Sequence, residues 1–222
     1  MTAVSAPSIT PHSVSLANSW SRNTLMKNVS RSAFLFGLAF AGTAFADAKS
    51  EVFAAWDAML AAKSYSTRMV TTVGEQTHTQ VIEVIVPDHA RSSGGPMGDL
   101  VLTPKGAWLK APGKDWGPAP EFMVTLTRQM MSPEFISKAK SGVTSAKDLG
   151  LQDFSGKPVR AYAIEQTLTI MGIQSHNTTR LLVEANSGRP LRQEIDSIMM
   201  GKSSHVVHDI TYVPDLKIDA PM

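Results

Sequence analysis

The stretch LLVEANSGRPLRQEID, residues 181–196, has the pattern of two β-strands joined by a turn. Apolar and polar residues alternate through Leu181 and Val183 before the turn, and through Ile195 after it. Because successive side chains of a strand point to opposite faces, this alternation indicates a sheet with one face packed on a core. The Asn-Ser-Gly sequence between the two runs consists of turn-forming residues. We therefore predict a β-hairpin, and we expect Leu182 and Ile195 to face the interior that could hold a ligand.

Strand-like runs, with a period of two or many β-branched residues, lie on both sides of residues 121–143. Turn residues separate them, and Gly172 is either a bend in one long strand or a break between two. The glycine-rich stretch 92–100 is interpreted as a loop. Because the connections are short, we expect antiparallel meanders. The predicted strand segments are 65–76, 78–87, 98–112 as two short strands, 158–175, 177–185, 189–200 and 204–213.

Two segments have helical spacing instead. Residues 48–64 place their large apolar residues on one face of a helix, namely Val52, Phe53, Trp56, Met59 and Leu60. Residues 121–143 contain Pro133, and a proline breaks a helix or occupies its first turn. The sequence therefore predicts an α+β fold with a single strongly curved antiparallel sheet. We expect the N-terminal helix and the central helices to cover the concave face, because an apolar sheet face has to be covered.

The first 46 residues differ from the rest of the chain in charge. They contain no Asp or Glu, and their three basic residues are Arg22, Lys27 and Arg31. A short apolar run follows and ends in Ala-Phe-Ala, so the segment has the three parts of a cleavable secretory signal peptide. The run is shorter than the roughly 20 residues of a membrane-spanning helix. We predict that translation starts at Met26, that cleavage follows Ala46, and that residues 47–222 form one domain.

Charge and cysteine content narrow the function classes. Residues 47–222 contain 18 Lys and Arg against 19 Asp and Glu, so they lack the basic excess typical of nucleic-acid binding. The chain has no cysteine, which excludes disulfides and a lipidated N-terminal cysteine. We therefore expect a soluble, exported, non-lipidated periplasmic protein that is a monomer and whose stability comes from its core.

The sequence contains no recognisable catalytic or cofactor motif. There is no Gly-x-Ser-x-Gly nucleophile turn and no glycine-rich phosphate loop before a helix, so we expect a protein without enzymatic activity or cofactor. His205 and His208 are three apart in a strand-like segment, so they should point to opposite faces and not share a metal ion. Ten methionines in residues 47–222 leave open copper binding through Met and His, because thioethers bind Cu(I).

Several stretches together resemble the periplasmic lipoprotein-carrier superfamily typified by LolA, which also includes LolB, the LppX and LprG lipid carriers and the sensor RseB. The likeness runs in order through residues 47–222, in 55–73, 84–93, 106–120, 147–166, 181–196 and 210–221. In AWDAMLAAKSYSTRMVTTV (55–73) a helix leads into a first strand, and KDLGLQDFSGKPVRAYAIEQ (147–166) is similar to the linker and strand after the central helices.

The resemblance implies an unclosed half-barrel of about eleven strands, with a helical lid over an apolar cavity. In that family the cavity takes the acyl chains of lipids or lipoproteins, and an arginine on an early strand controls the lid, a role that Arg68 would have here. The chain would then act in outer-membrane or envelope lipid trafficking, with an inner- or outer-membrane partner protein and transient membrane contact. A stress sensor or protein-interaction module of the RseB type is the other alternative.

Candidate lining residues follow from the apolar helix faces and from strand alternation. They are Trp56, Met59, Leu60, Met69, Val84, Val86, Trp108, Phe122, Met123, Leu126, Met130, Phe135, Ile164, Leu182 and Ile195.

Overall fold

The computed structural model describes residues 47–170 and 172–221; the predicted start, signal peptide and cleavage point lie outside them. The described residues form three helices and eleven strands. Their bounds are α1 (Ala48–Ala61), β1 (Ser64–Val73), β2 (Gln76–Ile85), β3 (His89–Gly95), β4 (Gly98–Thr103), β5 (Gly106–Lys110), β6 (Gly117–Pro118), α2 (Glu121–Met131), α3 (Pro133–Ser141), β7 (Val143–Phe154), β8 (Lys157–Ile170), β9 (Ile173–Glu184), β10 (Pro190–Met199) and β11 (Lys202–Tyr212).

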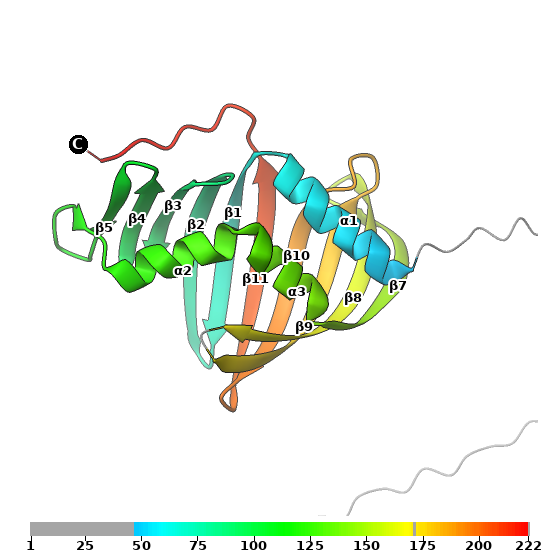
Figure 1. The fold of residues 1–222 in the computed structure, drawn as a ribbon. Coiled ribbons are helices and arrows are strands. Elements are labelled where there is room, and N and C mark those ends of the chain that lie inside the picture. The colour runs from blue at the N-terminus through cyan, green and yellow to red at the C-terminus, as the bar shows by residue number, and fades with distance from the viewer. Residues whose placement is uncertain (1–46, 171, 222) are drawn as a thin grey trace, which may run out of the picture. The chain divides into compact units, whose positions relative to one another are not determined.

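All eleven strands belong to one antiparallel sheet. Their order is β6-β5-β4-β3-β2-β1-β11-β10-β9-β8-β7, so the first strand pairs with the last and the other neighbours are consecutive. The edges β6 and β7 do not pair with each other, and the sheet remains an unclosed half-barrel. The helices lie on its concave side, with α2 and α3 crossing the sheet from the β5 side towards β7 (Figure 1). The predicted fold class is confirmed.

Helix α1 begins at an N-cap, because the Asp47 carboxylate accepts a hydrogen bond from the Lys49 amide. Its buried face consists of Val52 and Ala55, which pack on side chains of β7, β8 and β9. The helix ends at Ala61, before the predicted residue 64, because the chain turns there through Lys63 with φ +67° and enters β1.

The helical insertion divides at Pro133, as predicted. Pro133 occupies the first turn of α3, and the Ser132 hydroxyl caps that helix by accepting a hydrogen bond from the Phe135 amide. In α2 the buried residues are Met123 and Val124. Val124 packs against β3 and β4 and thereby seats the helix near one edge of the sheet.

Two strand predictions were wrong, and the alternative left open at Gly172 is decided. Residues 143–154 are the edge strand β7, whereas the sequence resemblance placed a linker in part of this segment. The stretch 92–100 is not a loop, since its two ends lie in β3 and β4. A Cβ on Gly98 would lie 2.1 Å from the Lys110 carbonyl oxygen, so this glycine allows two paired strands to approach closely. Of the two alternatives at Gly172, the structure has the break between two strands: Gly172, with φ +79°, forms the turn before β9, which runs without interruption from Ile173.

The register assigns every strand residue to one of two faces. We call the face that packs on α1 and α2 the inner face and the opposite one the outer face. Leu181 pairs with Tyr162 and packs on α1, whereas Leu182 packs with Val159 and Ala161 in a separate cluster of the outer face. A bulge at the start of β10, between Pro190 and Arg192, places Leu191 in that outer cluster.

Candidate functional site

A strip of half-buried side chains crosses the middle of the inner face. We call this the central strip; it consists of Met69 and Thr71 of β1, Gln80 and Ile82 of β2, Gln193 and Ile195 of β10, and Val206 and His208 of β11. Cross-strand pairing places them together, because Met69 is opposite both His208 and Gln80, and Ile195 is opposite Val206. Each of the eight side chains remains partly accessible to solvent.

The inner face is closed on both sides of this strip. Towards β7, the side chains of Ile164 and Leu181 are 1% and 0% exposed beneath α1. Towards β5, Ala90 and Leu102 are 4% and 0% exposed beneath α2. The helices therefore pack on the two flanks of the sheet.

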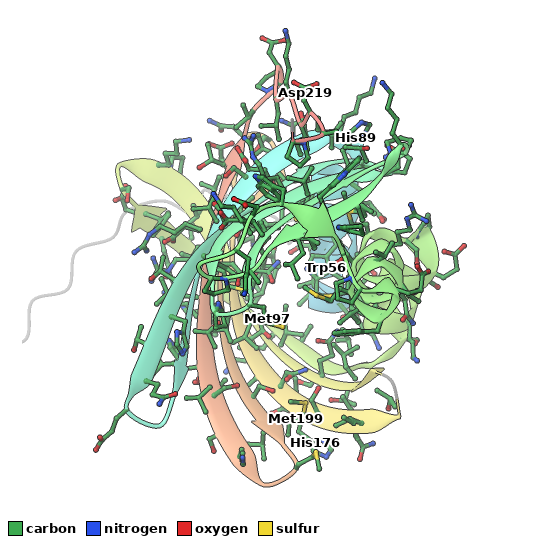
Figure 2. All side chains as sticks on the ribbon, turned by 90° about the vertical axis from the view of Figure 1, so that its left-hand side faces the viewer. Trp56, His89, Met97, His176, Met199 and Asp219 are labelled. Atoms are coloured by element: carbon green, nitrogen blue, oxygen red, sulfur yellow. The ribbon has the colours of Figure 1, made fainter. Side chains whose placement is uncertain are left out.

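The strip is not covered by a packed helix as the two flanks are. This is seen from adjacent residues of one strand, whose side chains point to opposite faces. Val206 of the inner face and Val207 of the outer face are both half-buried, as are Met69 and Val70. A side chain under a packed helix would be buried, as Leu181 is. The strip is therefore an accessible surface on the concave side of the sheet, with four apolar side chains (Met69, Ile82, Ile195 and Val206) among four polar ones. Figure 2 shows Trp56 of α1 on that same side, level with α2 and α3.

The helices that border the strip are held by polar contacts at their ends. The Gln166 side chain of β8 donates to the Ala139 carbonyl of α3 at 2.7 Å, and the Thr167 amide donates to the Gly142 carbonyl at 2.9 Å. Lys140 of α3 forms an ion pair with Asp57 of α1. The end of α3 is therefore fixed to the β7 side of the sheet and to α1.

Helix α1 is tied to the sheet by a second polar network. The Tyr162 hydroxyl donates to the Glu51 carboxylate at 2.7 Å, and burial together with this hydrogen bond raises the Tyr162 pKa. Arg160 lies 3.8 Å from Glu51 and donates to Asp148 at 2.6 Å. Hydrogen bonding to Arg160 lowers the pKa of the Asp148 carboxyl. The network orients α1 over β8.

The strip itself contains one titratable group, His208. Burial lowers its pKa, and the nearby Asp209 carboxylate opposes this to a smaller extent. Asp209 belongs to the outer face, where Arg192 donates to it at 2.8 Å. His208 is therefore a neutral polar group of the strip at neutral pH.

Ten of the fifteen predicted lining residues lie on the inner face or on the half-buried or buried side of a helix. On the sheet, Met69 and Ile195 belong to the strip, while Val84 and Ile164 are buried beside it. Met123 is buried in α2, and the half-buried helix residues are Trp56, Met59, Leu60, Leu126 and Phe135.

Phe122 and Met130 of α2 are exposed on the surface of the helix. Their exposed fractions are 61% and 50%, so both side chains contact solvent. Val86 follows the end of β2 and lies in a turn, where strand alternation no longer assigns a face.

Three predicted residues belong to the outer face. Leu182 packs in the outer cluster, so the prediction that it faces the interior is wrong. The neighbouring Leu181 is the residue that faces the inner side. Trp108 pairs with Val101, whereas the neighbouring Ala107 packs on the α2 cluster, so Trp108 also points outward. Arg68 is exposed opposite Asp209, so its side chain points away from the helices that it was expected to control.

The sequence reasoning missed six of the eight residues of the strip. These are Thr71, Gln80, Ile82, Gln193, Val206 and His208, although each lies in a predicted strand segment. Strand alternation groups Val206 with His208 and Ile82 with Gln80, but it does not say which group faces the helices. His205 and His208 do point to opposite faces, as predicted, and His205 forms a 2.7 Å contact with Asp196.

Two cavities of the described residues lie away from the central strip. The larger of them, about 630 Å³, is lined mainly by outer-face residues, among them Thr72, Glu165, Asp196 and His205. The inner-face residues Gln166, Asn177, Ser197 and Ser204 also border it. The smaller, about 410 Å³, is bordered by Phe154, Leu191 and Arg192 among others. None of the predicted lining residues borders either cavity.

Among residues 47–221 with the exception of 171, no three His, Cys, Asp or Glu side chains lie close enough together to hold a metal ion. Within the same part of the chain, no helix has the length and hydropathy needed to cross a membrane.

Solved structures with the same architecture exist. The lipoprotein LppX of Mycobacterium tuberculosis matches 78% of this chain and 98% of its own, with 15% identity and a TM-score of 0.55. LprF of Mycobacterium bovis matches 78% of this chain and 96% of its own, with 14% identity and a TM-score of 0.50. No protein-family model matches the chain, and no curated protein does. In its fold, the chain is thus a LolA-like half-barrel, as LppX and LprF are.

Proposed function

We propose that the chain is a non-enzymatic carrier or binder of lipids, or of the acyl chains of lipoproteins, and that the bound chain lies on the central strip. The observation that carries this proposal is the accessibility of apolar side chains on the concave side. Met69, Ile82, Ile195 and Val206 are partly accessible to solvent there, between two flanks whose side chains are buried. Such a surface is suited to an apolar ligand.

The energetics support an acyl chain as ligand. Removing one methylene from water is favourable by about 0.8 kcal/mol, so even eight methylenes on the strip would supply about 6 kcal/mol before ordering costs. The helices are anchored at the flanks of the curved sheet, so this surface is open between them. Binding a chain there needs neither a covalent bond nor a metal ion. Methionine on such a surface adapts to chains of different shape.

We also propose where in the cell this binding takes place and with which kind of partner. The predicted signal peptide supports export to the periplasm, where acyl chains moving through the envelope need protection from water. A donor or acceptor protein in the inner or outer membrane would then exchange cargo with the half-barrel, with transient contact at the membrane.

The adjacent residues Val206 and Val207 provide a matched test. Delipidated protein is titrated with a fluorescent fatty acid and with a fluorescent phospholipid, and the lysine variants V206K and V207K are compared with it. V206K removes contact with about two methylenes, or about 1.6 kcal/mol, which corresponds to about fifteen-fold weaker binding. V207K lies opposite Glu194 on the outer face and should bind as the unmodified protein does.

Absence of uptake by the unmodified protein would overturn the proposal. Equal weakening by V206K and V207K would also contradict it, because the site would then not lie on the inner face. Mass spectrometry of lipids that co-purify with the native protein identifies the cargo independently.

A further inference from the structure

Thr67 is buried on the inner face next to the central strip, and its hydroxyl has no hydrogen-bond partner among the described residues. The residue is 7% exposed, and its Oγ1 is the buried side-chain polar atom found there without a partner. A valine of nearly the same shape would fill the position without burying a hydroxyl. Since an unpaired buried hydroxyl destabilises the folded state, its presence points to a partner that is not part of this chain.

The register shows what lies around this hydroxyl. Thr67 is opposite Ile210 on one side and Ile82 on the other, so its direct neighbours are apolar. One position further along the same face of β1 is Met69, which lies opposite His208. Thr67 therefore stands at the border between the strip and the buried flank. Its Oγ1 is closed to solvent in the structure, so a polar group of a bound amphiphile would reach it by displacing the side chains that cover it.

The charge of this region selects the kind of polar group. The eight residues of the central strip, together with Thr67, include no Lys, Arg, Asp or Glu. A carboxylate or phosphate at this depth would have no cationic partner in the strip, and burying it would be costly. An uncharged carbonyl needs one donor, and a threonine hydroxyl supplies one.

We infer that the ligand carries an uncharged acyl carbonyl, of an ester or an amide, which accepts a hydrogen bond from the Thr67 hydroxyl while its chain lies along Met69, Ile82 and Ile195. The inference rests on the proposed function, since it specifies the ligand of the same surface. Lipid acyl esters and the N-acyl groups of lipoproteins share this carbonyl chemistry. Free fatty acids, which carry a carboxylate at neutral pH, do not.

The test compares four ligands with the same chain length: methyl palmitate, palmitamide, palmitate and hexadecane. Each displaces a fluorescent acyl probe from the unmodified protein and from Thr67→Val, which removes the hydroxyl with little change in shape. Thr67→Ser keeps the hydroxyl, and Thr72→Val removes a half-buried hydroxyl of the outer face as a matched control. Thermal unfolding is measured for each, and Thr67→Val should be at least as stable as the unmodified protein.

The unmodified protein should bind the ester or the amide about ten-fold more tightly than hexadecane and palmitate. Thr67→Val should lose that preference without losing hexadecane binding, whereas Thr67→Ser and Thr72→Val should keep it. The relative affinities of ester and amide distinguish a lipid source from an N-acylated protein source. Equal binding of ester and hexadecane by the unmodified protein, tighter binding of palmitate, or an unchanged preference in Thr67→Val would overturn the inference alone. Failure of all four ligands to bind would instead overturn the proposed function.

Discussion

Replacing Leu181 by alanine should destabilise the half-barrel by about 3 kcal/mol. Leu181 is 0% exposed and lies in the cluster that holds Val52 of α1 against β8 and β9. Truncation to alanine removes three carbon atoms, each worth about 0.8 kcal/mol of burial, and the remaining cavity adds to this loss. The result lies within the range of about 2–5 kcal/mol observed for buried Leu to Ala substitutions.

Urea unfolding followed by tryptophan fluorescence measures the effect directly. Trp56 packs against the same cluster, so its emission reports on the seating of α1. For a domain of this size the melting temperature should fall by about 6–12 °C. The control is Ile198→Ala on β10, whose side chain is 54% exposed and should cost less than about 0.5 kcal/mol.

A loss below about 1 kcal/mol for Leu181→Ala would refute this reasoning. So would a loss equal to that of Ile198→Ala, because the buried cluster would then contribute no more than an exposed position. An unchanged slope of free energy against urea concentration is the necessary check that both variants unfold in the same two-state manner.

Three further predictions concern single residues. Burial lowers the pKa of His208 in the folded state, so folding favours its neutral form. The free energy of unfolding should therefore decrease as the pH falls from about 6.5, the ordinary pKa of histidine, through that lower pKa. The variant His208→Gln should lack this part of the pH dependence when unfolding is measured at several pH values. Tyr162→Phe removes the hydrogen bond to the Glu51 carboxylate and should lower the free energy of unfolding, measured by chemical denaturation, by about 1.5–3 kcal/mol. An unchanged free energy of unfolding would show that Arg160 alone satisfies Glu51. Arg68→Ala should leave acyl-probe affinity and release rate unchanged, because the side chain is on the outer face; a slower or faster release would restore its expected role at the lid.

Local sequence patterns were sufficient for most elements of this fold. Pro133 predicted where the helical insertion divides, since the constraint acts within one turn of the chain. The turn at Gly188, with φ +66°, follows from the residues in it. The edge strand β7 was missed because its neighbour on one side is solvent, so its sequence lacks the apolar run of an inner strand.

The assignment of faces was beyond local patterns. Leu181 and Leu182 are equally apolar, and which of them faces the helices depends on α1, which is more than a hundred residues away in the chain. The bulge at Leu191 adds a further shift, because Leu191 and Ile195 have the same parity in the sequence but belong to opposite faces. Identifying the central strip required the pairing of β1 with β11, the longest connection in the sheet.

The anchoring of the helices explains why the middle of the inner face can remain open in a stable protein. Val124 fixes α2 to the β3–β4 flank, and Gln166 fixes the end of α3 to β8. The two helices therefore bridge the sheet from supports on both sides. On the strands between those supports the inner face is buried at Thr67 and Ile210 and partly accessible along the central strip. The buried clusters under α1 and α2 do not include Met69 or Val206, so a ligand can occupy the central strip without disturbing the residues that stabilise the fold. Binding and stability thus depend on different side chains of the same sheet face, which is why substitutions at Val206 and at Leu181 should have separable effects.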